Sequence, residues 1–368
     1  MTECKHFDLW DSGSETVSDW GEKLDQAHDD HLRIRDESIN NLLEREDIDQ
    51  ECLNLNKEQK LWSAEEYREQ VGLPITCPHE TVDGKDYCIF HLSPESRQNL
   101  GITKEDVLNE LVNKIKKSTG EDEDKKKCFA GAFLEDISIK YRGLSSESNK
   151  PVQFHFAKID NLDLSHSVID ERFVFNGSEI NEINCESTQF KKSVSFKKAE
   201  LNCQSVLFDR ATFEDRLDMS NTKINTKELN FKECSFRKRV NLSGMNVEID
   251  LDSKDDIDTR VQYNNSVFHD ELHHNNITFS FEDPDKLTEI YAEFKHCRFS
   301  SRANFSDCDF QSTLDDNTTD PSPYDLLEVS TDDLSKEDSE HEIEWYVDFS
   351  KSEFESGLLL NDLDLLGI

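Results

Sequence analysis

Large apolar side chains recur at short, regular steps from residue 154 onward in this 368-residue chain. The steps are mostly of five residues, with some of six or seven. A helix buries a side chain about every 3.6 residues and a strand every second residue, so neither fits this period as a continuous element. A five-residue period instead predicts a chain that turns a corner every five residues and buries one large side chain on each side. The centres of the series are Phe154, Ile159, Leu164, Ile169, Phe175, Ile180, Cys185, Phe190, Phe196, Leu201, Phe208, Phe213, Met219, Ile224, Phe231, Phe236 and Leu242, then Phe294, Phe299, Phe305 and Phe310, then Phe349, Phe354 and Leu360.

A second position supports this interpretation. Two residues before a centre reached by a five-residue step, the side chain is usually small, as at Ala157, Ser167 and Ala211. Before a longer step it is usually apolar, as at Phe173 and Val194. Coils stacked about 4.8 Å apart would align the large residues into columns. An ordinary β-sandwich is the alternative, but it needs hairpin turns every 8–12 residues or so, and the sequence does not show them.

The alternation of steps resembles the pentapeptide-repeat proteins in their phenylalanine-rich form. The segments FDRATFEDRLDM and FKKSVSFKKAEL carry the resemblance best. It covers roughly residues 150–245, 290–310 and 345–362. The resemblance implies a mainly β fold, a right-handed quadrilateral parallel β-helix with four pentads per coil. A small α-helical region would precede it.

The predicted solenoid domain spans residues 128–368, with two insertions at 246–290 and 311–344. The second insertion holds twelve acidic residues against the single Lys336, a composition typical of a loosely held loop. The first contains His269, His273 and His274, and histidines four residues apart could share a helix face and bind a metal. No third ligand stands at a matching spacing, so we assign no metal to this insertion.

The N-terminal third is predicted to be mainly helical and polar. Residues 1–70 form a charged, partly disordered region with short helices. Residues 71–127 form a Cys/His module, a helix and a linker. The helix is expected over 103–117, with Thr103 as its N-cap and Asp106 at the capping-box position. Such a helix would cover the edge of the first coil, which otherwise offers unpaired backbone groups.

The module contains the one group of residues with evident metal chemistry. Cys77, His79, Cys88 and His91 are residue types that zinc prefers, and four such ligands close a tetrahedral structural site. Cys-x-His stands where Cys-x2-Cys is the usual spacing. Buried thiols beside surface histidines are the alternative. The segment also resembles a Cys/His module that precedes the repeats in some pentapeptide-repeat proteins of halophiles.

The charge balance excludes several partners. The chain has 42 Lys and Arg against 80 Asp and Glu, a net charge of −38. Proteins that bind nucleic-acid backbones or anionic membranes need clustered cations, so we expect neither partner. The acidity fits a halophilic surface, or alternatively a basic partner or nucleic-acid mimicry. We find no signal peptide and no long apolar stretch, and therefore expect a cytoplasmic protein whose cysteines are reduced core residues or metal ligands.

No phosphate-binding, metalloprotease or nucleophile-elbow motif occurs in the sequence. We therefore expect a non-catalytic scaffold or protein-interaction module. One alternative, implied by the family resemblance, is a DNA mimic that binds a topoisomerase or another DNA-binding protein. Another is a zinc-dependent recognition head on a solenoid stalk. The partner is expected to be a protein of unknown identity, and a homodimer through a solenoid end is also open.

Overall fold

A computed structural model describes ten stretches of the chain, which fall into two compact units. Unit 1 comprises Met1–Glu135 and Ser146–Lys158, and unit 2 comprises Asp136–Ser145 and Ile159–Ile368. The short helices expected within residues 1–70 and the acidic segment 311–343 lie outside the described residues. The described residues are 3–4, 77–119, 125–249, 260–275, 277–281, 289–305, 309–310, 344–348, 352–355 and 358–359.

Unit 2 is built from short strands arranged in four parallel sheets, here called sheets I to IV. Sheet I contains, in spatial order, β10 (Phe173–Val174), β14 (Val194–Ser195), β18 (Leu217–Asp218), β22 (Val240–Asn241), β26 (Leu272–His273), β30 (Ala303–Asn304) and β34 (Leu358–Leu359). Sheet II contains β11 (Glu179–Ile180), β15 (Glu200–Asn202), β19 (Lys223–Thr226), β23 (Asn246–Ile249), β27 (Thr278–Phe281) and β31 (Asp309–Phe310). In the chain, β7 (Lys158–Ile159) spans the boundary between the two units.

Sheets III and IV have the same construction. Sheet III contains β4 (Ile137–Ser138), β8 (Leu162–Asp163), β12 (Ile183–Asn184), β16 (Ser205–Leu207), β20 (Glu228–Asn230), β24 (Arg260–Gln262), β28 (Glu289–Glu293) and β32 (Glu344–Asp348). Sheet IV contains β5 (Gly143–Ser145), β9 (Val168–Asp170), β13 (Gln189–Phe190), β17 (Thr212–Phe213), β21 (Ser235–Phe236), β25 (Val267–Phe268), β29 (Arg298–Phe299) and β33 (Glu353–Phe354).

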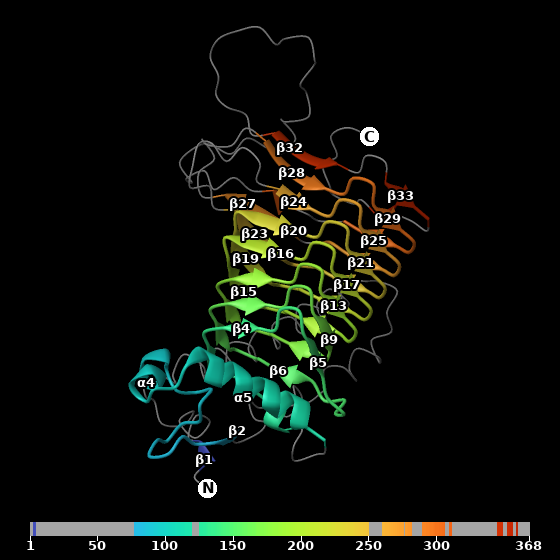
Figure 1. The fold of residues 1–368 in the computed structure, drawn as a ribbon. Coiled ribbons are helices and arrows are strands. Elements are labelled where there is room, and N and C mark those ends of the chain that lie inside the picture. Colours follow the sequence, from blue (N-terminus) through green and yellow to red (C-terminus); the bar gives the residue numbers. More distant parts are fainter. Residues whose placement is uncertain are drawn as a thin grey trace, which may run out of the picture. The chain divides into compact units, whose positions relative to one another are not determined.

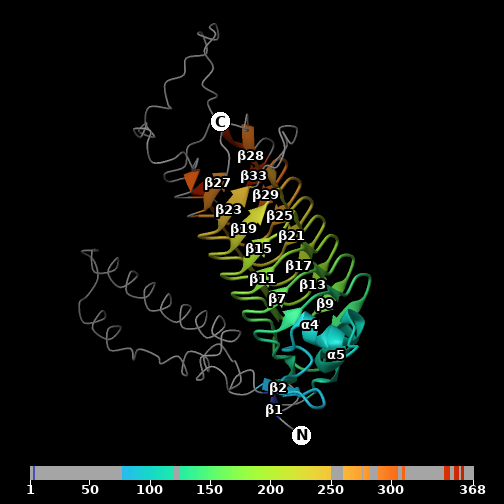
Figure 2. The same ribbon diagram turned by 90° about the vertical axis from the view of Figure 1, so that its left-hand side faces the viewer.

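Each strand pairs with the strand four positions later in the chain, so four strands make one coil. Thus β13 pairs with β17, and β17 pairs with β21. Figures 1 and 2 show the resulting stack, in which successive strands of sheets II and IV follow one another in sequence order. The prediction of a mainly β, parallel solenoid is confirmed.

The predicted centres from Ile159 to Leu242, together with Phe294, Phe299 and Phe305, are buried in the core of unit 2, whereas Phe349 and Leu360 lie outside the described residues. In sheet IV the rings from Phe190 to Phe354 stack in register, with centroids 4.6 to 5.1 Å apart. A second column contains Phe208, Phe231, Tyr263 and Phe294, at 4.4 to 5.1 Å. Burial of each large side chain stabilises the fold by about 1.5–3 kcal/mol. The repeated inward phenylalanine is therefore what holds one coil on the next.

The small residue two positions before many of the centres lies at a corner of the coil and forms hydrogen bonds there. At these corners the chain passes through a residue with positive φ, such as Arg210 at 57°. The next amide then bonds back to the preceding centre, as from Ala211 N to Phe208 O at 2.9 Å. Hydroxyls and thiols at the small position donate to carbonyls of the preceding coil. Examples are Thr188 Oγ1 to Leu164 O at 2.7 Å and Cys234 Sγ to Phe208 O at 3.0 Å.

The prediction of an insertion at 246–290 is wrong for the described residues of this range, because they continue the solenoid. Strands β23 to β27 continue the four sheets in register. The inward positions here carry Tyr263 and His274, both buried, and neither belongs to the predicted series of centres. His273 belongs to β26 and pairs with Glu271 at 3.4 Å, whereas His269, which follows β25, is exposed. These residues form strands and turns and not a helix.

Unit 1 contains the helices and the Cys/His module. Its elements are β1 (Glu3–Cys4), β2 (Cys77–Glu80), α4 (Pro94–Asn99), α5 (Lys104–Lys117), η2 (Lys125–Lys127), β3 (Phe133–Leu134) and β6 (Val152–Gln153). The predicted capping box is confirmed, since Thr103 and Asp106 exchange hydrogen bonds at the start of α5. Helix α5 buries Val107, Leu111 and Ile115. No helix within the described residues has the length and apolar character needed to cross a membrane.

Candidate metal centre

A hairpin brings the cysteines of the module together. Strand β2 begins at Cys77, and a turn closed by the bond from Val82 N to Tyr87 O at 3.0 Å reverses the chain. Gly84, with φ of +71°, supplies the left-handed conformation that this turn requires. The returning chain forms a bridge between Thr81 and Cys88. Cys88 therefore lies beside the strand that carries Cys77.

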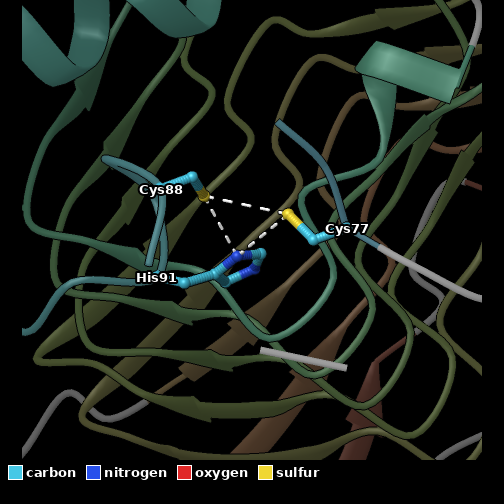
Figure 3. A group of neighbouring side chains, drawn as sticks. All are labelled: Cys77, Cys88 and His91. Carbon is cyan, nitrogen blue, oxygen red and sulfur yellow. Dashed lines mark hydrogen bonds between the residues drawn. The ribbon is translucent and has the colours of Figure 1, made fainter. Parts of the chain in front are cut away.

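Three potential metal ligands, the side chains of Cys77, Cys88 and His91, converge at this hairpin (Figure 3). The two Sγ atoms are 3.8 Å apart. His91 Nδ1 is 3.3 Å from Cys77 Sγ and 3.1 Å from Cys88 Sγ. All three residues are buried. Zn–S bonds of about 2.3 Å and Zn–N bonds of about 2.0–2.1 Å at tetrahedral angles place two sulfurs about 3.8 Å apart and a sulfur and a nitrogen about 3.6 Å apart. The sulfur spacing fits a bound ion, and the sulfur–nitrogen distances are slightly shorter than that ideal.

The ring of His91 is held in the orientation that a metal ligand needs. Its Nε2 lies 2.9 Å from the carbonyl oxygen of Ala130, so this nitrogen carries the proton and donates. When the ring is neutral, its Nδ1 lone pair faces the two thiols. A second hydrogen bond of this kind usually accompanies ligating histidines, because it fixes both the tautomer and the ring plane. The cluster can therefore hold a metal ion.

His79, the fourth predicted ligand, does not join the other three. Its ring stacks on Phe129, with centroids 5.1 Å apart and planes 15° apart, and meets the edge of Phe90 at 4.7 Å. Its Nε2 lies 2.8 Å from the carbonyl oxygen of Cys128. Phe129 stacks in turn on Phe154. His79 thus extends an aromatic column of unit 1 and does not lie with the two cysteines and His91 as a potential metal ligand.

Arg97, at the last turn of α4, fixes the loop between Cys88 and His91. Its side chain is 1% exposed, and its Nη2 lies 3.3 Å from Glu135 Oε2. Nη1 donates to the carbonyl of Ile89, within the loop, at 3.4 Å. Nothing in the sequence marks this residue, because a single arginine in a charged chain gives no signal of burial.

The remaining thiols and histidines of the core are poor candidates for chemistry. Burial raises the pKa of Cys128, Cys203 and Cys297 to about 12, and it raises the pKa of Cys234 further. These thiols stay protonated, whereas nucleophilic cysteines need a lowered pKa. Burial also lowers the pKa of His274 to about 4, so that its ring is neutral at pH 7. The prediction that cysteines of the repeat are small core residues is confirmed for Cys185, Cys203, Cys234 and Cys297.

Comparison of the chain with protein-family models, with curated proteins and with solved structures gave no match.

Proposed function

We propose that this chain is a non-catalytic, cytoplasmic scaffold for protein contacts, a pentapeptide-repeat-like solenoid that carries a zinc-stabilised N-terminal head. The solenoid supplies a rigid wall, and the zinc ion has a structural role in the head. The reduced, buried cysteines are consistent with a cytoplasmic location.

The distribution of charge supports a contact surface for proteins. Residues 77–249, which include the head and the central coils, contain 29 Asp and Glu against 26 Lys and Arg. Residues 1–76 and 250–368 together contain 51 acidic and 16 basic residues. The net charge of −38 therefore belongs almost wholly to the flanking regions. Protein interfaces are depleted in Asp, Glu and Lys but enriched in Arg. Coils without a large net charge therefore suit a protein partner better than the acidic flanking regions do.

One register position of sheet I carries the proposal. The residue that precedes each strand of sheet I is an exposed arginine in four of the coils, and the strand register places these side chains in one row along the stack. Arginine is enriched at protein interfaces and their hot spots, because its planar guanidinium binds carboxylates with two hydrogen bonds. Arg239 pairs with Glu271 at 2.9 Å. The row consists of Arg172, Arg216, Arg239 and Arg302.

The same distribution weakens DNA mimicry as an alternative. A mimic needs regular rows of carboxylates on the solenoid wall, but the central coils carry lysine and arginine almost as often as acids. The acidic residues that make this chain resemble DNA in net charge lie mostly outside those coils. We therefore favour a partner that presents carboxylates to the arginine row.

Charge reversal of the row tests the proposal. Two variants are compared with the wild type. The first reverses the charge of the row with Arg172→Glu, Arg216→Glu, Arg239→Glu and Arg302→Glu. The second is a control that changes the net charge by the same amount elsewhere on unit 2, with Lys140→Glu, Lys197→Glu, Lys223→Glu and Lys227→Glu. Cross-linking in cell extract at the native salt concentration, followed by mass spectrometry, identifies the partners of each. We expect the lysine variant to keep the wild-type partners and the arginine variant to lose them. Identical partners for all three proteins, or turnover of a substrate by the purified chain, would refute the proposal.

A further inference from the structure

The three converging side chains give a structural metal ion only three of the four ligands that it needs. Structural zinc sites have four protein ligands, commonly four cysteines, three cysteines and a histidine, or two of each. Cys77, Cys88 and His91 supply three. His79 is engaged with Phe129 and with the Cys128 carbonyl. A closed site therefore needs a donor from another element of unit 1.

The N-terminal strand brings such a residue to the site. Strand β1 pairs antiparallel with β2, and the register aligns Cys4 with Cys77 and Glu3 with Glu80, with an irregularity between the two pairs. Directly opposed residues of antiparallel strands have Cβ atoms about 4.5–5.5 Å apart and lie on the same face of the ladder. Cys4 thus occupies the register position opposite a residue whose thiol belongs to the cluster.

We propose that Cys4 is the fourth ligand of this metal centre, which is then a Cys3His zinc site. The inference rests on the proposed structural metal and adds the residue that closes it. The juxtaposition that carries it is the pairing of Cys4 with Cys77 across β1 and β2. Binding of Zn²⁺ releases the protons of the three thiols, while His91 binds as the neutral imidazole.

The fourth ligand has a consequence for the N-terminal region. Through the ion, residue 4 is tied to residues 77, 88 and 91, which joins two segments far apart in the sequence. A cross-link of this kind restricts the unfolded chain, as a disulfide does. Removal of zinc therefore releases strand β1 as well as the hairpin.

Metal binding by the full-length chain tests the inference. Purified protein is stripped with chelator, titrated with Zn²⁺ and with Co²⁺, and examined by competition with a chromophoric chelator and by the Co²⁺ absorption spectrum. The variants are Cys4→Ser, Cys88→Ser, His6→Ala and the matched control Cys52→Ser. The Co²⁺ charge-transfer bands report the number of thiolate ligands independently of affinity.

We expect wild type, Cys52→Ser and His6→Ala to bind one ion with three thiolates. Cys4→Ser is expected to bind roughly 100-fold more weakly or worse, with two thiolates, since even the loss of a residue that only supports a ligand costs 10–100-fold. Cys88→Ser should lose the site. Unchanged affinity and thiolate count in Cys4→Ser would overturn the role of Cys4 while leaving the metal centre in place. Loss of binding in His6→Ala alone would assign the fourth ligand to His6. Absence of binding by wild type would instead refute the metal itself.

Discussion

Truncation of one ring in the sheet IV column should measure how strongly the aromatic stack holds the coils. Phe213 is 1% exposed and lies between Phe190 at 5.0 Å and Phe236 at 5.1 Å. A phenylalanine that buries roughly 150–250 Å² contributes about 4–6 kcal/mol at 25 cal/mol per Å², an upper bound because the unfolded chain is already partly compact. Measured Phe→Ala costs in cores are about 3–5 kcal/mol. We therefore expect Phe213→Ala to lower the free energy of unfolding by about 4 kcal/mol.

Urea denaturation followed by far-UV circular dichroism, at one salt concentration, measures this change. The matched control is Thr212→Ala, because Thr212 is the neighbouring residue of β17 and is only partly buried. A surface change of this kind usually alters stability by less than about 0.5 kcal/mol. If Phe213→Ala and Thr212→Ala had the same denaturation midpoint, the stacked column would not be what stabilises the solenoid.

Three further changes have expected outcomes. Arg97→Met should weaken metal binding by about 10–100-fold, because it frees the loop before His91. The control Lys104→Ala removes a mostly exposed partner of Glu135 and should leave the affinity within about twofold. Competition with a chelator measures the affinity of both variants. The pKa of His274 is lowered from 6.5 to about 4 by burial, so the unfolded state binds the extra proton and stability falls as the pH drops from about 6.5 towards 4. His274→Phe should therefore show a smaller loss of unfolding free energy between pH 7.5 and pH 5.0 than wild type, and an equal loss would contradict a neutral buried ring. The buried thiols of the repeat should react with a thiol reagent only after denaturation, as timed labelling and mass spectrometry would show; rapid labelling of Cys234 or Cys297 in the native protein would contradict their burial.

The sequence was sufficient to predict the solenoid because the fold repeats one local rule. Each coil satisfies the pattern of a large and a small inward residue independently, so errors at single positions do not alter the result. The prediction failed where Tyr263 and His274 occupy inward positions, since their polar atoms suggest a surface loop. The structure shows that ring shape matters more than polarity there, because Tyr263 stacks between Phe231 and Phe294.

The candidate site could be predicted only in part, because contacts between distant segments decide which of the predicted ligands come together. Residue types and spacing were enough to find Cys77, Cys88 and His91. They could not separate these from His79, which lies two residues from Cys77 on the same strand but stacks on Phe129. The hydrogen bond from His91 to Ala130 and the Arg97–Glu135 pair join segments about forty residues apart. No local pattern reports such pairs.

We infer that unit 1 is held together by a structural metal ion. Native mass spectrometry of the full-length chain, purified without added metal or chelator, tests it most directly. We predict one zinc ion per chain, lost in Cys88→Ser and retained in Cys52→Ser. A metal-free wild-type chain that still binds no zinc when the ion is added in excess would contradict the claim.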